Sequence, residues 1–175
     1  MGRPDVVTTP RLDLVALSPP LVAALVADDV ARARALAPFP LDAGTFAADA
    51  YVLGLRHAQL TADPSQEPWL LRAAVDRAGG QVVARIGFHA PVDADGAVEV
   101  GYAVAPERRR QGLALEMCRA LLAWGAEHGV RTVVASVAPD NTASLATIAR
   151  LGFVRTGEQV DEVDGLEWVH ALRLT

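Results

Sequence analysis

Seven consecutive residues in the second half of the chain have the types and the order expected of an anion-binding loop. They are Arg108, Arg109, Arg110, Gln111, Gly112, Leu113 and Ala114. An apolar, strand-like run precedes them, and a strongly periodic helical segment follows. The first turn of a helix has unpaired backbone N–H groups and a partial positive charge, so an anion can dock there. Glycine leaves the backbone accessible, and arginine forks suit phosphate oxygens. The loop therefore predicts a pyrophosphate site.

The same residues also fit an ordinary surface connection, because a glycine and several arginines before a helix are common. Two well-known phosphate loops are disfavoured. A P-loop ends in Gly-Lys-Ser/Thr, whereas this chain contains no lysine. A dinucleotide-binding turn needs three glycines in the first strand-to-helix connection, whereas this loop lies late in the chain and has one. The sequence thus favours a phosphate loop of another kind.

Composition limits the classes to which the protein can belong. With 175 residues, 51% hydrophobic and 21% charged, we expect one compact domain, residues 1–175. The formal net charge of -5 argues against nucleic-acid binding, which needs an extended basic surface. A single cysteine, Cys118, excludes an intrachain disulfide and fits a reducing, cytoplasmic compartment. No apolar run is long enough to span a membrane, and no signal peptide is visible, so we expect no membrane association.

The periodicity of apolar residues and the turn residues predict a mixed α+β sheet. In the first half we expect a strand at residues 12–17, a helix that begins after Ser18 at Pro19 and continues to about residue 36, and a helix at 45–60. Strands at 69–76, 81–89 and 97–105 follow as an antiparallel meander, with turns at Gly79-Gly80 and at 93–96.

The second half alternates between helices and strands. We expect a helix at residues 113–128 that stops at Gly129, a buried strand at 130–137, and a short helix at 142–151 that ends at Gly152. A strand starting at Phe153 and a final strand at 166–174 complete the sheet, joined by an Asp164-Gly165 turn.

Two motifs in this arrangement resemble the GNAT superfamily of acyl-CoA N-acyltransferases. Arg109-x-x-Gly112-x-Ala114 is similar to the pyrophosphate loop of the family, and Asn141-x-x-Ser144 is similar to its second coenzyme segment. Each follows a predicted strand and opens a predicted helix, and they lie about 30 residues apart. The resemblance covers nearly the whole chain. It includes Leu151-Gly152-Phe153 after the second motif.

Two further segments resemble the branch of the family that acetylates the N-termini of ribosomal proteins. They are Thr9-Pro10-Arg11-Leu12 and Glu99-Val100-Gly101-Tyr102. That branch also contains small-molecule acetyltransferases. The resemblance therefore implies an acetyltransferase that acts on a protein N-terminal amine or on a small amine.

The resemblance implies a single-domain GNAT fold, an α+β architecture whose mostly antiparallel sheet is flanked by helices. Its middle strands, around residues 100–104 and 133–137, would splay apart and admit the pantetheine arm of acetyl-CoA, whose amides can pair with the exposed strand edge. The loop at residues 108–114 would hold the pyrophosphate. The backbone N–H groups near Ala103 and Val104 would hold the thioester oxygen. No metal is expected.

Three polar side chains are candidates for the chemistry. Glu99 is the candidate base for the attacking amine, directly or through a water, although a solvated or salt-bridged strand acid fits the sequence as well. Ser144 matches a position that the family uses near the coenzyme sulfur, and a local helix cap is the alternative. Many members have a tyrosine acid there, whereas the 142–151 segment has none. Asn141 is expected to cap this helix and to bind pantetheine, with capping alone as the alternative.

Other reactive residues favour structural roles. Cys118 lies on the apolar side of its predicted helix and has no base nearby in sequence. His57, His89, His128 and His170 lack metal-ligand spacing, and the three tryptophans are more typical of packing than of substrate binding. An acidic loop, formed by Asp161, Glu162 and Asp164, is expected either to be a solvated turn or, by analogy with the family, to border the acceptor channel.

The sequence therefore predicts an acetyl-CoA-dependent N-acetyltransferase that uses direct attack in a ternary complex. The alternative is a catalytically silent acyl-CoA-binding sensor. The amine acceptor and any acyl group other than acetyl remain open at this point. So does the oligomeric state, although homodimers are common in such enzymes.

Overall fold

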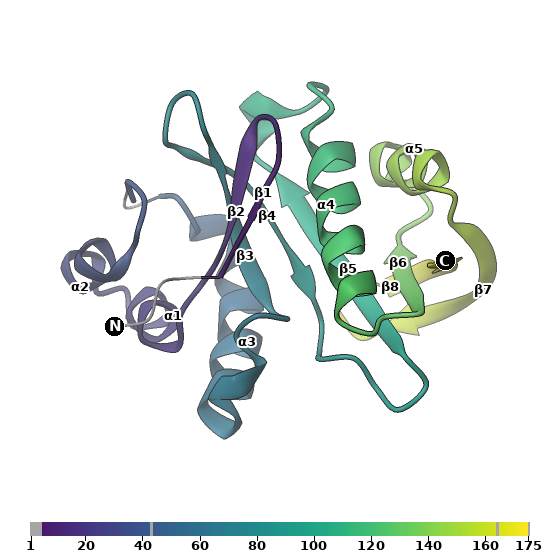
Figure 1. Cartoon of the computed structure of the whole chain (residues 1–175), viewed down its shortest axis with the longest axis horizontal. Coiled ribbons are helices and arrows are strands. Elements are labelled where there is room, and N and C mark those ends of the chain that lie inside the picture. The colour runs from purple at the N-terminus through teal and green to yellow at the C-terminus, as the bar shows by residue number, and fades with distance from the viewer. Residues whose placement is uncertain (1–4, 43, 164, 175) are drawn as a thin grey trace.

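The computed structural model describes residues 5–42, 44–163 and 165–174. Eight strands form one sheet in the order β1-β2-β3-β4-β5-β6-β8-β7 (Figure 1). Their bounds are β1 Val6–Thr8, β2 Leu12–Ala16, β3 Leu71–Asp76, β4 Val82–Phe88, β5 Ala97–Val104, β6 Thr132–Val137, β7 Val154–Asp161 and β8 Gly165–Arg173. All neighbouring strands are antiparallel except β5 and β6, which are parallel. The predicted α+β class and the meander of β3, β4 and β5 are confirmed.

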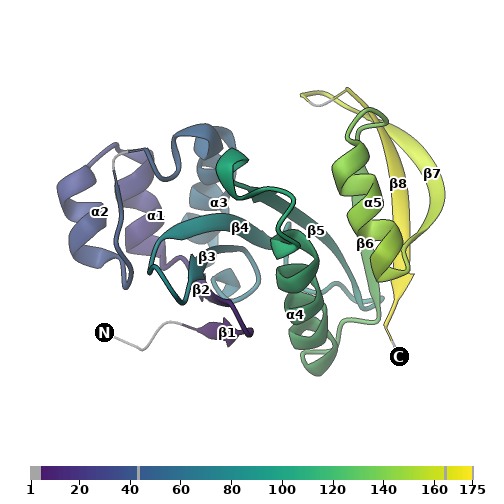
Figure 2. The same ribbon diagram turned by 90° about the horizontal axis from the view of Figure 1, so that it is seen from above.

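Helices cover both faces of the sheet (Figure 2). They are α1 Pro19–Val26, α2 Val30–Leu36, α3 Ala50–Ala62, α4 Leu113–Glu127 and α5 Thr142–Leu151, with short 3-10 turns η1 Ala47–Asp49, η2 Pro64–Gln66 and η3 Pro106–Arg108. One core cluster joins α4 and α5 to the sheet through Met117, Leu121 and Ile148. A second cluster joins α1, α2 and α3 to the opposite face, where Leu21 and Leu53 are buried.

The single helix predicted up to residue 36 is wrong, because the chain forms α1 and α2 with a break between them. Asp28 adopts a left-handed φ of 53°, which ends α1. The Asp29 side chain then accepts a hydrogen bond from the Arg32 N–H (3.0 Å) and caps α2. Short polar side chains such as aspartate tolerate left-handed backbone and favour the N-cap, so this pair restarts the helix.

Smaller differences concern element ends. The helix expected at residues 45–60 becomes regular only at Ala50 and ends at Ala62. Strand β1 has only three residues, too few for an alternating pattern to show. Strand β8 lies between β6 and β7, an insertion that the sequence order did not predict. Asp164 of the predicted final turn lies outside the described residues.

Gly87 of β4 lies very close to the backbone of Leu70. A Cβ added to Gly87 would lie 1.8 Å from the Leu70 carbonyl oxygen, so the two backbones would have to separate. We expect Gly87→Ala to lower the free energy of unfolding by about 3 kcal/mol, as in strong overpacking. Urea unfolding measures this change. Gly54→Ala is the control, because nothing lies within 4 Å of its added Cβ in α3, and alanine should stabilise that helix. Equal stability of the two variants would contradict the prediction.

Candidate functional site

The loop before α4 presents unpaired backbone N–H groups. Gly112 is the N-cap residue with a left-handed φ of 76°, and no side chain caps the helix. The first intrahelical bond is from the Glu116 N–H to the Gly112 carbonyl (3.1 Å), so the N–H groups of residues 113–115 precede the ladder. Arg110 is also left-handed, with φ 61°. These N–H groups are available to an anion, and the pyrophosphate site stays a prediction.

The N-terminal segment fixes this loop from the side. The Arg11 Nε lies 2.6 Å from a Glu116 carboxylate oxygen, and an Arg11 guanidinium nitrogen donates to the Gln111 carbonyl (2.9 Å). The Thr9 hydroxyl also donates to the Glu116 carboxylate (2.6 Å). Burial raises the Glu116 pKa, but the bonds from Thr9 and Arg11 outweigh it, so the pKa is lowered overall. Sequence reasoning listed Thr9 and Arg11 as a motif but did not connect them to the loop.

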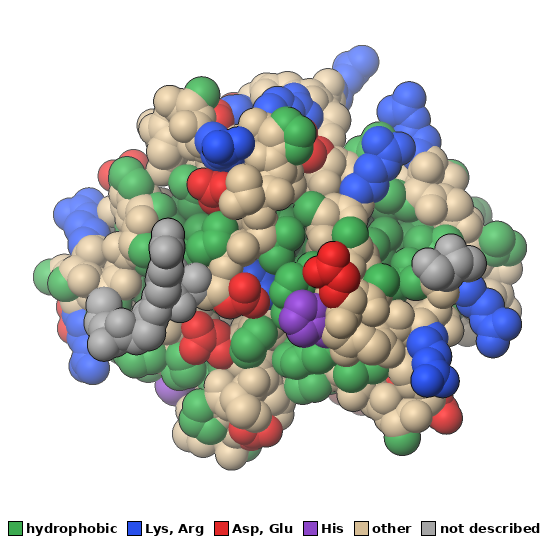
Figure 3. Space-filling view, viewed as in Figure 1, with side chains coloured by type: hydrophobic (Ala, Val, Ile, Leu, Met, Phe, Trp, Pro, Cys, Tyr) green, Lys and Arg blue, Asp and Glu red, His purple; other side chains and the backbone are tan. Residues whose placement is uncertain are grey.

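Two of the three arginines are already bound by the protein. Arg108 donates to the Asp76 carboxylate (2.8 Å) and to the Gln111 side-chain oxygen (3.3 Å). The bond from Arg108 lowers the Asp76 pKa. Arg109 donates from Nε to the Val104 carbonyl (3.1 Å). Basic side chains project from the upper edge of the molecule, above α4 (Figure 3). The edge is thus cationic even though Arg108 is ion-paired.

Strands β5 and β6 separate at the centre of the sheet. Their registered pairs end with Glu99 and Val134, after which β5 runs on to Val104 and β6 to Val137. This confirms the predicted splay. The Ala105 N–H donates to the Val83 carbonyl of β4 (2.9 Å), so the alternating antiparallel pattern also directs the Ala103 N–H toward β4. The Val104 N–H therefore faces the gap, and its role as a donor to the coenzyme stays a prediction. The Ala103 N–H faces β4, so the register does not support the same role for Ala103.

The first turn of α5 borders the same gap. The Asn141 side-chain oxygen accepts from the Ser144 N–H (3.1 Å), which confirms that Asn141 caps the helix. Gly152, with φ 92°, ends the helix as predicted. Asn141 and Ser144 both line a cleft of about 590 Å³, a volume within the usual range of small-molecule sites.

Residues from seven helices and strands of the described chain meet in this cleft, including Arg85 of β4. Its wall includes Tyr51, Leu55 and Arg56 of α3, His89, Glu99 and Tyr102 beside or on β5, Ser136 of β6, Asn141 and Ser144 at the start of α5, and Asp161 and Glu167 of the β7–β8 hairpin. The structure thus brings together three predicted site residues: Glu99, Asn141 and Ser144. The loop at residues 108–112 does not line this cleft. It follows the far end of β5, between that strand and α4.

Glu99 has a polar environment that keeps it ionised. The His89 Nδ1 lies 3.5 Å from its carboxylate. The interaction with His89 lowers the Glu99 pKa, burial opposes this, and Ser136 lowers it further. Sequence reasoning dismissed His89, whose position opposite Glu99 follows from the β4–β5 register, in which the His89 N–H donates to the Glu99 carbonyl (2.8 Å). A carboxylate and an imidazole therefore face the cleft together.

Cys118, Trp69 and Trp124, which the sequence assigned to packing, have that role. Cys118 is buried in α4, and burial raises the pKa of its thiol to about 12, so a thiolate nucleophile is disfavoured. His128 stacks on Trp124 at 4.0 Å between ring centroids, and Trp124 also meets Trp69 edge-on. Within residues 5–42, 44–163 and 165–174, no group of three or more His, Cys, Asp and Glu side chains could hold a metal.

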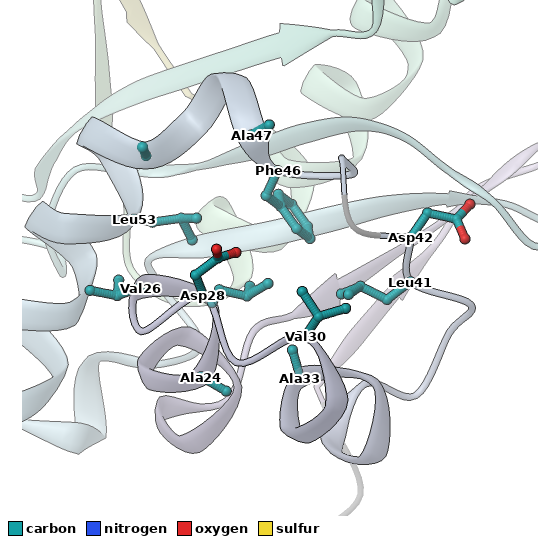
Figure 4. Close-up of a pocket in the computed structure, with 12 residues that line it drawn as sticks. Ala24, Val26, Asp28, Val30, Ala33, Leu41, Asp42, Phe46, Ala47 and Leu53 are labelled. Carbon is teal, nitrogen blue, oxygen red and sulfur yellow. The ribbon is translucent and has the colours of Figure 1, made fainter.

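A second cavity lies apart from these motifs. It opens between α1, α2 and the start of α3, and its lining is mostly apolar, with Asp28 and Asp42 at its edge (Figure 4). Neither the loop before α4 nor the splayed strands contribute to it. We therefore place the candidate chemistry in the cleft of Glu99. Within the described parts of the chain, no helix is long and apolar enough to cross a membrane.

The open strand edge, the uncapped helix and the cleft are the features that the resemblance to the GNAT superfamily implies. The family model of the acetyltransferase (GNAT) domain matches residues 11–154, so the chain belongs to this family. It is 32% identical over 78 residues to the uncharacterized N-acetyltransferase YoaA of Bacillus subtilis (strain 168), which is 44% of each chain. The chain spans about half the length of the curated relatives that it matches.

Solved structures share the fold at low sequence identity. The ribosomal-protein-S5-alanine acetyltransferase of Vibrio fischeri is 15% identical, with a TM-score of 0.66 over 97% of this chain and 96% of that chain. Mycobacterium smegmatis RimJ in complex with CoA-disulfide is 20% identical, with a TM-score of 0.64 over 97% of this chain and 88% of that chain. The resemblance to the GNAT superfamily, inferred from the paired motifs, is confirmed by the family model, and these structures share its fold.

Proposed function

We propose that this protein is an N-acetyltransferase that transfers the acetyl group of acetyl-CoA to a primary amine by direct attack in a ternary complex. One observation carries the proposal. Beyond its last pair with β6, β5 runs from the cleft that holds the Glu99 carboxylate to the loop that precedes the uncapped N-terminus of α4. That order matches a coenzyme whose phosphates lie at one end and whose thioester lies at the other.

The coenzyme would be held mainly by backbone groups. The pyrophosphate would accept hydrogen bonds from the N–H groups that follow Gly112, with Arg109 and Arg110 contributing charge. The pantetheine amides would pair with the free edge of β5, where the Val104 N–H faces the gap, and the thioester would lie toward the cleft. Acetyl-CoA, when bound, supplies the activated acyl group. The protein supplies its orientation.

The acceptor amine must be neutral when it attacks. A free α-amine, with a pKa of about 7.7–8.0, needs only about 1 kcal/mol to lose its proton at pH 7, whereas lysine needs about 4.6 kcal/mol. The lowered pKa of Glu99 makes it a weak base, which suits the easier of these two tasks. We therefore favour an α-amine, such as a protein N-terminus, with Glu99 receiving the proton directly or through a water.

The charges in the cleft also suit a cationic acceptor that arrives protonated. Glu99, Asp161 and Glu167 line the cleft. The two arginines of the wall already have partners: Arg56 donates to Gln59 and to the His89 carbonyl, and Arg85 pairs with Asp49. The acidic loop predicted to border the acceptor channel thus contributes Asp161, while Asp164 lies outside the described residues. Attraction by these carboxylates would concentrate amines near the thioester.

A thiol-release assay tests the proposal. The panel would contain peptides with ribosomal-protein N-termini, the same peptides with blocked N-termini, polyamines and aminoglycosides, each with acetyl-CoA. We expect release of CoA with the free peptides and none with the blocked ones. Background rates across the panel, together with calorimetric binding of acetyl-CoA, would instead support a catalytically silent acyl-CoA sensor. Absence of both would contradict the proposal entirely.

Arg11 should matter for coenzyme binding rather than for turnover. Arg11→Ala removes the bonds to Glu116 and to the Gln111 carbonyl, so the loop loses its lateral support. We expect the coenzyme KM to rise about fivefold, a cost of about 1 kcal/mol, with kcat nearly unchanged. Steady-state kinetics measure both constants. Arg77→Ala is the matched control, because Arg77 is equally exposed and binds the carbonyls of Thr9 and Pro10 instead of the loop. A similar KM in both variants would contradict the prediction.

A further inference from the structure

Tyr102 has a buried hydroxyl group that the fold leaves without a hydrogen bond. The hydroxyl oxygen is inaccessible to solvent, and within the described residues no side chain or backbone group bonds to it. Ser144 and Thr147 of α5 approach it closely enough to affect its pKa, although not in hydrogen-bonding geometry. Buried polar groups are almost always paired in folded proteins, so an unpaired one needs an explanation. A ligand atom that occupies the cleft would supply the missing partner.

The side chains of Tyr102 and Glu99 lie on opposite faces of β5. Side chains alternate along β5, and Val98, Val100 and Tyr102 pack with the core cluster of α4 and α5. Glu99 projects from the other face, where His89 lies. Both residues nevertheless line the same cleft. A thioester that passes through the gap between β5 and β6 would therefore have Glu99 on one face and the Tyr102 hydroxyl on the other.

We propose that the Tyr102 hydroxyl donates a hydrogen bond to the coenzyme sulfur and stabilises the departing thiolate. This inference rests on the proposed function. The amine nitrogen forms a bond to the acyl carbon from the Glu99 face. The carbon–sulfur bond breaks toward the Tyr102 face, and its electron pair remains on sulfur. The amine proton passes to Glu99 or water, and the thiolate later takes a proton from solvent, so the products are the amide and free CoA.

The proton of Tyr102 stays on its oxygen throughout. Burial raises the Tyr102 pKa, while Ser144 and Thr147 lower it to a smaller extent. A thiol has an ordinary pKa of about 8.5 and a phenol one of about 10, so a thiolate does not remove the phenolic proton. The hydroxyl therefore acts as a fixed donor. Ser144, which the sequence predicted for this task, lies beside Tyr102 and shares the same face of the gap.

Tyr102→Phe separates this role from a structural one, because it removes only the hydroxyl. Deleting an unpaired buried hydroxyl should leave the melting temperature unchanged or raise it. We expect kcat to fall about 10- to 100-fold, as for a lost hydrogen bond to a charged group, with the coenzyme KM within about twofold. A raised KM with normal kcat, or a lower melting temperature that accounts for the lost activity, would overturn the inference.

A second measurement needs no acceptor and so distinguishes this inference from the proposed function. The ultraviolet absorbance of the thiolate, followed against pH, gives the thiol pKa of CoA bound to the protein. We expect it to lie below that of free CoA in the wild type and to rise by about one unit in Tyr102→Phe. Thr147→Val is the control, because its hydroxyl already donates to the Ala143 carbonyl (2.9 Å) and does not line the cleft. An equal thiol pKa in wild type and Tyr102→Phe would overturn the inference even if the wild type acetylates amines.

Discussion

Glu99→Gln is expected to lower kcat for an α-amine acceptor by about 100-fold or more, the usual contribution of a positioned proton acceptor. Glutamine keeps the size of the side chain and a hydrogen-bonding oxygen, but it cannot take the amine proton. The affinity for acetyl-CoA should remain within about twofold, because Glu99 lies in the cleft and not in the loop of Gly112. Pre-steady-state mixing of the variant with acetyl-CoA and peptide separates the chemical step from product release.

The pH dependence of this variant provides a further check. His89 lowers the Glu99 pKa, so the carboxylate of the folded protein remains ionised at pH values at which a free glutamate is already protonated. The stability that this depressed pKa contributes is therefore complete above the ordinary glutamate pKa and is lost as the pH falls through the lower folded pKa. Glu99→Gln should not show this loss of stability in acid. At neutral pH its kcat should still be lower than that of the wild type by the full amount. Wild-type kcat in Glu99→Gln at neutral pH would show that the amine loses its proton elsewhere.

The features predicted correctly from sequence are those that depend on neighbouring residues. Gly112 after three arginines and before a periodic helix is a local pattern, and the capping of α5 by Asn141 is another. Alternating strands and glycine turns were enough to identify the β3–β4–β5 meander. The splay of β5 and β6 was implied by the family resemblance rather than by the residues themselves.

The missed features depend on contacts between distant segments. Arg11 and Glu116 are 105 positions apart, and nothing in either segment alone indicates their pairing. His89 and Glu99 become neighbours only through the register of a hairpin, which a shift of one residue would reverse. Tyr102 belongs to a motif that was recognised, but its unpaired hydroxyl became visible only when α5 was placed beside β5. The site is thus assembled by tertiary contacts that local patterns do not encode.

Replacing Gly112 is expected to have the largest effect on coenzyme binding. Its φ of 76° is a left-handed conformation that costs a residue with a Cβ about 1–2 kcal/mol. Among the described residues beyond its chain neighbours, an added Cβ would have one atom within 4 Å, a guanidinium nitrogen of Arg11 at 3.6 Å. The methyl group would otherwise enter the open space that we assign to the phosphates. Gly112→Ala should therefore weaken CoA binding by about tenfold or more. If the backbone relaxes away from the left-handed conformation, the N–H groups of the loop move. If the backbone keeps that conformation, the new methyl group stands between these N–H groups and the phosphates. Isothermal titration calorimetry measures the affinity.

Gly129→Ala provides the matched control for Gly112→Ala on the same helix. Gly129 follows the opposite end of α4 and has a left-handed φ of 92°, with nothing within 4 Å of an added Cβ. Both variants should lose a similar free energy of unfolding, about 1–2 kcal/mol, because both force alanine into left-handed backbone. Only Gly112→Ala should lose affinity for CoA, since Gly129 has no place in the loop. If the two variants bound CoA equally well, the phosphates would not lie at the N-terminus of α4, and backbone strain alone would account for both phenotypes.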